Sequence, residues 1–213
     1  MAKTSYDLIR CGLLAVTLIA APALAQSAPE RGVFVTQIGD GSRATIAQTN
    51  SDSLARVVQD GNDNQLDLAQ NGSAPHTAQI AQDGDGNIAR SQQDGDGSTE
   101  LVLVQTGDAN MAAVQQSEIS SSAQSAASIY QQGNGNSVVL AQNGSDNNAT
   151  LEQLGDNNTM TAIQIDSGNR LLWSQSGDGL SDLGIEQRGG GNIQVTQSAA
   201  GAQFAPPPGA GGG

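Results

Sequence analysis

The sequence has few of the large or reactive side chains on which most globular cores and active sites depend. Only 2% of its 213 residues are aromatic, and it contains one cysteine, Cys11, and one histidine, His76. A nucleophile triad or a zinc site needs several such residues, so neither can be assembled here. The sequence therefore argues against an enzyme, and we expect no catalytic, metal-binding or cofactor-binding residues.

Positive charge is also scarce. Eight Lys and Arg residues stand against 21 Asp and Glu residues, which gives a net charge of −13, and Lys3 is the only lysine. Binding to a phosphate backbone requires clustered cations. Nucleic acid is therefore not an expected partner.

Long hydrophobic runs are missing as well. The apolar run at residues 12–21 is too short to span a membrane, so no membrane span is expected in the mature chain. It follows Lys3 and Arg10 and precedes small residues ending at Ala25, which is the pattern of a secretory signal peptide at residues 1–25. Since Cys11 lies within this segment, we expect a secreted, cysteine-free mature protein.

The sequence is rich instead in one short phrase, Gln-x-Gly-x-x-Asn-x-Ala-x-x-x-Gln. Residues 82–93, 105–116 and 142–153 match it at every defined position. The phrase recurs about every 11 residues, and a short fixed period is typical of a solenoid or stacked array. Its glutamines are Gln37, Gln48, Gln59, Gln70, Gln82, Gln93, Gln105, Gln116, Gln131, Gln142, Gln153, Gln164, Gln175, Gln187 and Gln197.

The spacing within the phrase predicts an all-β fold. Counted from the first Gln, the Asn lies at +5, small or apolar residues at +7 and +9, and the next Gln at +11. These odd offsets share one face of a strand, while the Gly at +2 begins a turn. Two such 11-residue half-repeats would form a flat strand-turn-strand rung of about 22 residues. We therefore predict a β-solenoid of about seven rungs, stacked parallel and in register as in cross-β structure.

Stacking would place identical side chains above one another at ~4.8 Å and form amide ladders. Beside the glutamines, the ladder residues are Asn87, Asn110, Asn136, Asn147, Asn158 and Asn169, and the turn glycines are Gly39, Gly61, Gly72, Gly84, Gly95, Gly107, Gly133, Gly144, Gly155, Gly177 and Gly189. The residues expected inside are Leu66, Leu68, Ala112, Val114, Val138, Leu140, Ala149, Leu151 and Trp173. Arg43, Arg56, Arg90 and Arg170 have the opposite parity, as a dry interior requires.

The repeat also sets the domain boundaries. Residues 26–36 form an N-terminal segment in which Val33 and Val35 share the inward parity, residues 37–197 form the solenoid, and the Gly- and Pro-rich residues 198–213 read as a disordered tail. Pro75 falls in a longer unit and predicts an enlarged turn, because Pro cannot donate to a strand ladder. The glycine-free stretch 116–131 predicts an interruption or bulged loop. No capping helix is apparent at either end, and a folded cap would favour a monomeric protein.

The phrase resembles the repeat of the curlin family, the secreted subunits of curli, which are extracellular amyloid fibres of bacteria. The likeness covers roughly residues 37–197 and is complete at Gln105, Gly107, Asn110, Ala112 and Gln116. It implies export through an outer-membrane secretion pore, self-association into fibres on the cell surface, a second curlin-type subunit as partner, and a role in adhesion and biofilm matrix. Either subunit type, major or nucleating, fits the resemblance.

A calcium-binding repeat adhesin of the β-roll type, which stays monomeric, is the alternative. Asp83, Asp85, Asp94 and Asp96 alternate with glycines and so place oxygens at alternate positions. The calcium roll, however, repeats every nine residues. Asp and Gly are also favoured in turns for backbone geometry alone, and this explanation is preferred.

Overall fold

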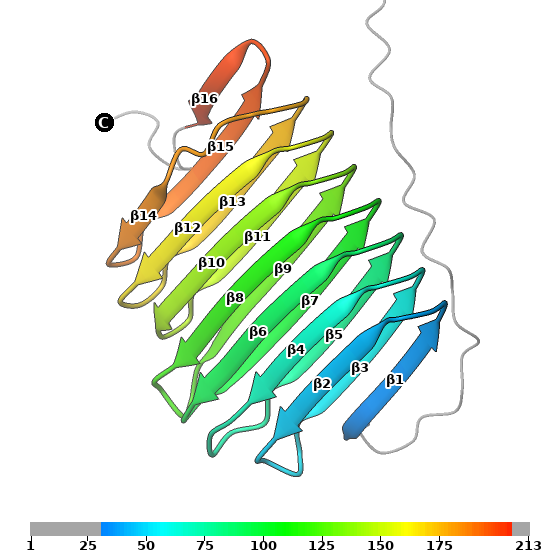
Figure 1. Cartoon of the computed structure of the whole chain (residues 1–213). Coiled ribbons are helices and arrows are strands. Elements are labelled where there is room, and N and C mark those ends of the chain that lie inside the picture. The colour runs from blue at the N-terminus through cyan, green and yellow to red at the C-terminus, as the bar shows by residue number, and fades with distance from the viewer. Residues whose placement is uncertain (1–30, 206–213) are drawn as a thin grey trace, which may run out of the picture. The chain divides into compact units, whose positions relative to one another are not determined.

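A computed structural model of the chain describes residues 31–205, and every regular element in that part is a β-strand (Figure 1). Successive strands alternate between two sheets, here named sheet A and sheet B. Sheet A contains, in spatial order, β1 (Gly32–Ile38), β3 (Leu54–Asp60), β5 (Thr77–Asp83), β7 (Ser98–Thr106), β9 (Gln124–Gln132), β11 (Asn148–Leu154), β13 (Arg170–Ser176), β15 (Asn192–Ser198) and β16 (Gly201–Ala205). Sheet B contains β2 (Arg43–Gln48), β4 (Gln65–Gln70), β6 (Ile88–Gly95), β8 (Met111–Glu118), β10 (Ser137–Gly144), β12 (Thr159–Ile165) and β14 (Ile185–Arg188).

From β1 to β15, neighbouring strands within each sheet run parallel and in the register of the repeat. Gln59 lies beside Gln82 in sheet A, and Gln70 lies beside Gln93 in sheet B. Neighbouring glutamines are 22, 23 or 26 residues apart in sequence. The β-solenoid of strand-turn-strand rungs predicted from the half-repeats is confirmed.

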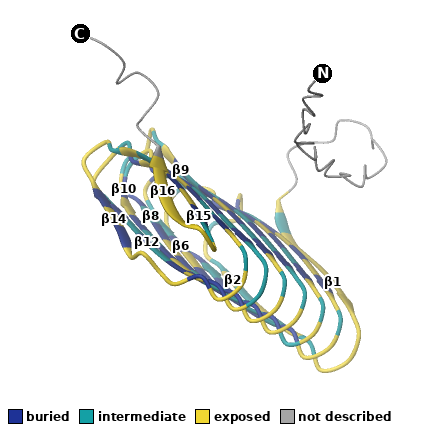
Figure 2. Cartoon of the chain, turned by 90° about the horizontal axis from the view of Figure 1, so that it is seen from above, coloured by how far each residue is buried: buried dark blue, intermediate teal, exposed yellow. Residues whose placement is uncertain are grey.

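Side chains alternate between the interior and the surface along each strand (Figure 2). The residues expected inside are all buried, namely Leu66, Leu68, Ala112, Val114, Val138, Leu140, Ala149, Leu151 and Trp173. Arg43, Arg56, Arg90 and Arg170 are exposed on the opposite faces of their strands. The parity assigned from the sequence is therefore confirmed, and the narrow interior is filled by aliphatic side chains and amides, with Trp173 its bulkiest fully buried residue.

The irregular units keep the register by placing their extra residues in turns. Pro75 lies in the turn between β4 and β5, as expected, and β5 still aligns with β3 and β7. The long unit after Gln116 extends β8 to Glu118 and then forms a loop before β9. Gln131 nevertheless lies beside Gln105, so the stretch is a bulged loop rather than an interruption of the stack.

The expected disordered tail is wrong over its first residues. β15 continues to Ser198, and β16 folds back antiparallel on it after a turn at Ala199 and Ala200. The physical reason is the edge of β15, whose backbone N–H and C=O groups need partners. Gly201, with φ of +117°, supplies the backbone conformation that lets the chain reverse there. The signal peptide predicted at 1–25 and the tail residues 206–213 lie outside the described residues.

The alternation generates a stability prediction within a single strand. Leu140 is buried and Val139, its neighbour in β10, is 38% exposed. We expect Leu140→Ala to lower the free energy of unfolding by about 2–5 kcal/mol, because it leaves a cavity in a packed interior. Val139→Ala should cost less than about 1 kcal/mol, which is the range of strand preferences on a solvated face. Urea unfolding of both variants measures the difference, and equal losses would contradict the assigned register.

Candidate functional site: the amide ladders

The repeat glutamines form two continuous ladders, one at the end of each sheet's strands. In sheet A the ladder runs through Gln37, Gln59, Gln82, Gln105, Gln131, Gln153, Gln175 and Gln197, and in sheet B through Gln48, Gln70, Gln93, Gln116, Gln142, Gln164 and Gln187. Each Nε2 donates to the Oε1 of the next glutamine at 2.5–3.1 Å. The thirteen from Gln59 onward are buried, whereas Gln37 is exposed and Gln48 half-buried.

The second hydrogen of each amide fixes the direction of the ladder. Nε2 of Gln93 donates to the backbone O of Thr77 at 3.0 Å, and Nε2 of Gln116 donates to that of Glu100 at 3.0 Å. A backbone carbonyl only accepts hydrogen bonds, so it identifies which side of the amide is nitrogen. Every ladder bond therefore points the same way along the solenoid. Each interior glutamine connects its rung both to the next rung and to the opposite sheet.

The predicted asparagines line the corners where strands begin. At the corner that leads into sheet B, backbone N of Asn110 donates to Oδ1 of Asn87 at 3.0 Å, while Nδ2 of Asn87 donates to the backbone O of Gly107 at 2.8 Å. Asn136 continues the same pattern. The backbone N of Asn158 does so as well, but its buried Nδ2 has no partner. These side chains thus carry the parallel hydrogen-bond ladder through the turn.

The corner that leads into sheet A is mixed. Asn147 and Asn169 lie there, but the earlier rungs have Ser53, His76, Thr99 and Ser125 at the equivalent position, all buried. Hydroxyl oxygens take over the amide's function as acceptors, since backbone N of His76 donates to Oγ of Ser53 at 3.0 Å and backbone N of Asn147 to Oγ of Ser125 at 3.1 Å.

His76 is held neutral in this corner. Its Nε2 donates to the backbone O of Asn71 at 2.7 Å, and its Nδ1 accepts from Oγ1 of Thr99 at 3.1 Å. Burial lowers the pKa of His76, outweighing the carbonyl of Asn71 and the charge of Asp94, which act in the opposite direction.

All eleven predicted turn glycines have positive φ, from Gly39 to Gly189. Gly107 illustrates why the residue is required: its φ is +104°, and an added Cβ would lie 2.3 Å from the backbone O of Gly133 in the next rung. Both the left-handed conformation and the close stacking exclude a side chain. Asp166, which replaces the glycine in its unit, also has a positive φ, of +69°.

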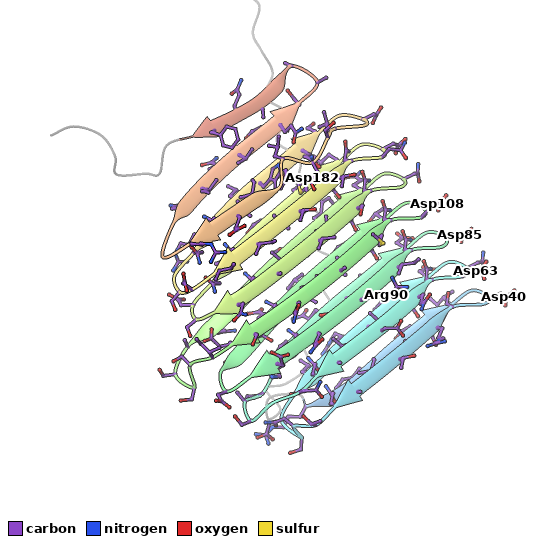
Figure 3. All side chains as sticks on the ribbon, turned by 60° about the vertical axis from the view of Figure 1, so that its left-hand side comes forward. Asp40, Asp63, Asp85, Arg90, Asp108 and Asp182 are labelled. Carbon is purple, nitrogen blue, oxygen red and sulfur yellow. The ribbon has the colours of Figure 1, made fainter. Side chains whose placement is uncertain are left out.

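A third ladder, on the outer edge of the turns, was missed as a structural element. Successive turns place Asp40, Asn62, Asp85, Asp108, Asn134, Asp156 and Asp178 above one another, and each backbone N–H donates to the side-chain oxygen of the next residue at 2.7–2.9 Å. Figure 3 shows several of these aspartates in a row along one edge. The recurrence of Asp or Asn at offset +3 was the available signal.

Glu118 was also missed. It occupies the position of a turn glycine in the bulged loop, and its side chain is fully buried. Its carboxylate accepts from the backbone N–H of Ser120 and Asp146, both at 3.0 Å, and from Oγ of Ser125 at 2.8 Å. Although burial opposes ionisation most strongly, the combined hydrogen bonds hold its pKa below the ordinary value. A carboxylate thus replaces the backbone partners that a regular turn would supply.

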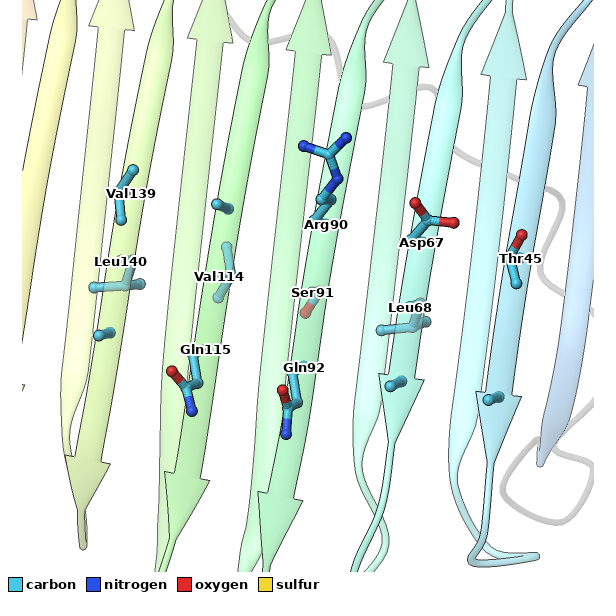
Figure 4. Close-up of a pocket in the computed structure, with 14 residues that line it drawn as sticks. Thr45, Asp67, Leu68, Arg90, Ser91, Gln92, Val114, Gln115, Val139 and Leu140 are labelled. Atoms are coloured by element: carbon cyan, nitrogen blue, oxygen red, sulfur yellow. The ribbon is translucent and has the colours of Figure 1, made fainter.

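The outer face of sheet B has a shallow groove of about 560 Å³ (Figure 4). It exists because outward residues such as Ala47, Ala69 and Ala113 are small, and Asp67 and Arg90 are the charged residues that line it. None of the predicted ladder residues lines it. Within residues 31–205, no group of three or more His, Cys, Asp or Glu side chains is arranged to hold a metal ion.

Comparison with known protein families bears on these ladders. Residues 125–155 and 133–165 match the family model described as the curlin associated repeat. This part of the chain, residues 125–165, is therefore similar to the curlin associated repeat. The matched part runs from β9 to β12 and contains two glutamines of each ladder, Gln131 and Gln153 in sheet A and Gln142 and Gln164 in sheet B.

The match confirms the resemblance to the curlin family at the level of the repeat and supports a curli-related subunit in general. No curated protein and no solved structure matched the chain. In the part of the chain that the structure describes, no helix is long and apolar enough to cross a membrane.

The environment of His76 predicts how stability depends on pH. Its folded pKa is lowered, so below about pH 6.5 the unfolded chain binds a proton that the folded chain does not, and stability falls as the pH falls. Between pH 7 and pH 5.5 we therefore expect the His76→Asn protein to lose less stability than the wild-type protein does. The lowered pKa of Glu118 also makes stability fall as the pH falls, but only near and below its ordinary pKa of 4.5. Glu118 therefore contributes little between pH 7 and pH 5.5. Urea unfolding at the two pH values tests this, and parallel losses in both proteins would refute it.

Proposed function

We propose that this chain is a secreted structural subunit that polymerises into curli-like amyloid fibres. The observation that carries the proposal is that the N-terminal edges of both sheets are uncovered, so the glutamine ladders end there without a partner. No described strand pairs with the outer edge of β1 or of β2. Unpaired strand edges recruit further strands. A second copy offers the same amides in the same register.

The composition of the first rung supports this. Val33, Phe34, Val35 and Ile38, all on β1, are large hydrophobic residues that remain between 43% and 56% exposed. Val33 and Val35 have the parity of the core, so they are the open end of the apolar interior. A rung from another molecule would cover them.

An end-to-end joint has a defined polarity. Because every ladder bond donates toward the C-terminal end, Oε1 of Gln37 is the free acceptor of sheet A, and Nε2 of Gln197 in another copy is the donor that would reach it. Such a heterologous contact does not close and produces a filament. Sheet A then continues without a break, whereas sheet B, which has one repeat strand fewer, keeps one open strand position beside β14 at each joint.

The same proposal covers export and partners. The expected signal peptide, an outer-membrane secretion pore and a second curlin-type subunit fit a subunit that assembles on the cell surface, where it would serve adhesion and biofilm matrix. The repeat match supports this setting. The role is structural rather than enzymatic, because the ladders engage the repeat's polar groups in hydrogen bonds within the fold.

One observation favours the monomeric adhesin. β16 covers the edge of β15, and covered edges are how proteins avoid further strand pairing. It covers sheet A alone, however, and leaves β14 as the edge of sheet B. The fibre proposal therefore remains the better supported of the two.

The direct test uses residues 26–213, followed by thioflavin fluorescence and fibre diffraction with and without sonicated seeds, in calcium and in chelator. We expect seeded growth and reflections near 4.7 Å and 10 Å, the spacings of strands and of packed sheets. A chain that stays monomeric for days under every condition, and whose melting temperature rises with calcium, would replace the fibre proposal with the adhesin.

The ladder ends should control growth more than the ladder centre does. Gln37 and Gln197 end the sheet A ladder, which is the ladder that continues through the joint, whereas Gln105 and Gln116 lie within ladders. We expect Gln37→Ala with Gln197→Ala to slow seeded elongation by about tenfold, since a buried amide left unpaired costs ~1–3 kcal/mol at the joint.

The central pair is the matched control. Gln105→Ala with Gln116→Ala should lower the urea midpoint of the monomer more than the terminal pair does. If the central pair slows seeded growth more than the terminal pair, the end-to-end model fails and lateral association becomes the better account.

A further inference from the structure

The last described strand of the chain lies where an added molecule would have to bind. β16 pairs antiparallel with β15, placing Phe204 opposite Val195 and Ala202 opposite Gln197. Directly opposite residues of an antiparallel pair lie on the same side of a sheet. Phe204 and Ala202 therefore lie on the side of the core. Figure 1 shows β16 beyond β15, at the end of sheet A.

The repeat shows what should follow β15 in a filament. Leu151, Trp173 and Val195 form one row, and Gln153, Gln175 and Gln197 form the next. Val35 and Gln37 of β1 begin these same rows at the other end of the solenoid. In a second copy stacked in register, Val35 would lie on Val195 and Gln37 on Gln197.

β16 supplies only one of the two contacts that a stacked β1 strand would make with β15. Phe204 offers an apolar side chain over Val195, as Val35 would, but Ala202 has no amide to continue the ladder beyond Gln197. Nε2 of Gln197 donates to the backbone O of Ser181 at 2.8 Å. Its other hydrogen, which interior glutamines donate to the next rung, meets no acceptor on Ala202.

β16 is also held by fewer interactions than the strands it imitates. It is five residues long, and Gly201, Ala202, Gln203 and Phe204 are all exposed, Phe204 by 65%. A strand that lacks a hydrophobic face against a second layer adds little stability in water. The β1 strand of another copy would offer seven residues, parallel pairing and a ladder glutamine.

We propose that β16 is a displaceable cap on the C-terminal end of sheet A, and that its competitor is the β1 strand of a second copy of this chain. The cap keeps newly exported chains from joining, and it leaves when β1 pairs with β15. This inference rests on the proposed end-to-end polymerisation and adds the element that restrains it.

A disulfide can hold the cap in place. Thr196 and Gln203 lie directly opposite each other on β15 and β16, and both side chains are exposed. Opposite residues in antiparallel strands have separations that suit a disulfide. Since Cys11 is the chain's only cysteine and lies outside residues 26–213, Thr196→Cys with Gln203→Cys in that chain creates a single pair.

With the disulfide formed, as checked by free-thiol titration and mass, we expect seeded elongation on wild-type seeds to fall at least about tenfold. Addition of reductant to the same sample should restore it, and wild-type protein treated identically is the control. If the disulfide-bonded chain elongates as fast as the reduced chain, the proposal that β16 is a cap is refuted.

Truncation supplies the opposite change. A chain ending at Ala199 lacks β16, and a matched control ending at Ala205 keeps it while removing the remaining tail. We expect the shorter chain to elongate at least about threefold faster, because its joining-competent end is always available. Equal rates would overturn the inference while leaving polymerisation intact. If wild-type, reduced and truncated chains all fail to grow on seeds, polymerisation itself is refuted.

Discussion

The constraint on which the whole structure depends is that burying an amide in a narrow, dry interior is costly unless its hydrogen bonds are satisfied. A buried polar group without a partner costs ~1–3 kcal/mol, and this chain buries a glutamine in almost every strand. The stack resolves the problem for the interior glutamines in one way: each of their amides donates once along the solenoid and once across it. That solution exists only when successive rungs are parallel and in register, so the polar interior specifies the alignment that the small apolar residues alone would leave loose.

The same constraint explains where the sequence is free to vary. Extra residues at Pro75 and in the loop after Glu118 are confined to turns that lead into sheet A, and the glutamines on either side still align. At the corner of that edge, serine, threonine or histidine can replace asparagine, because each supplies a replacement hydrogen bond. At the glycine position of the turn, a glutamate that supplies hydrogen bonds or an aspartate with positive φ can replace glycine. The opposite edge keeps an unbroken column of glycines from Gly39 to Gly177 and an outer ladder of Asp and Asn side chains. It varies only near its two ends, where Ser42 takes a corner position and a longer loop precedes β14.

A solenoid held by nearest-neighbour ladders makes folding and assembly nearly the same reaction. The contacts that add β13 to β11 are of the kind that would add β1 of another molecule to β15, and only connectivity distinguishes them. Control over assembly therefore has to act at the ends. β16 is a small element in a position of this kind: it competes with the next rung without altering any interior contact.

The strand parity, the parallel register and the buried set from Leu66 to Trp173 follow from the amino-acid sequence alone, as do the ladder positions of the glutamines and asparagines. The reason is that a period of about 11, with polar residues at fixed odd offsets, has one consistent arrangement. Only the tertiary structure showed that His76 and Ser125 belong to an asparagine corner and that the carboxylate of Glu118 replaces a turn, since these depend on which residues from distant rungs become neighbours. Only the tertiary structure placed residues 201–205 on β15. Their Gly- and Pro-rich surroundings indicated no strand, and the partner that orders them is an edge created by folding itself.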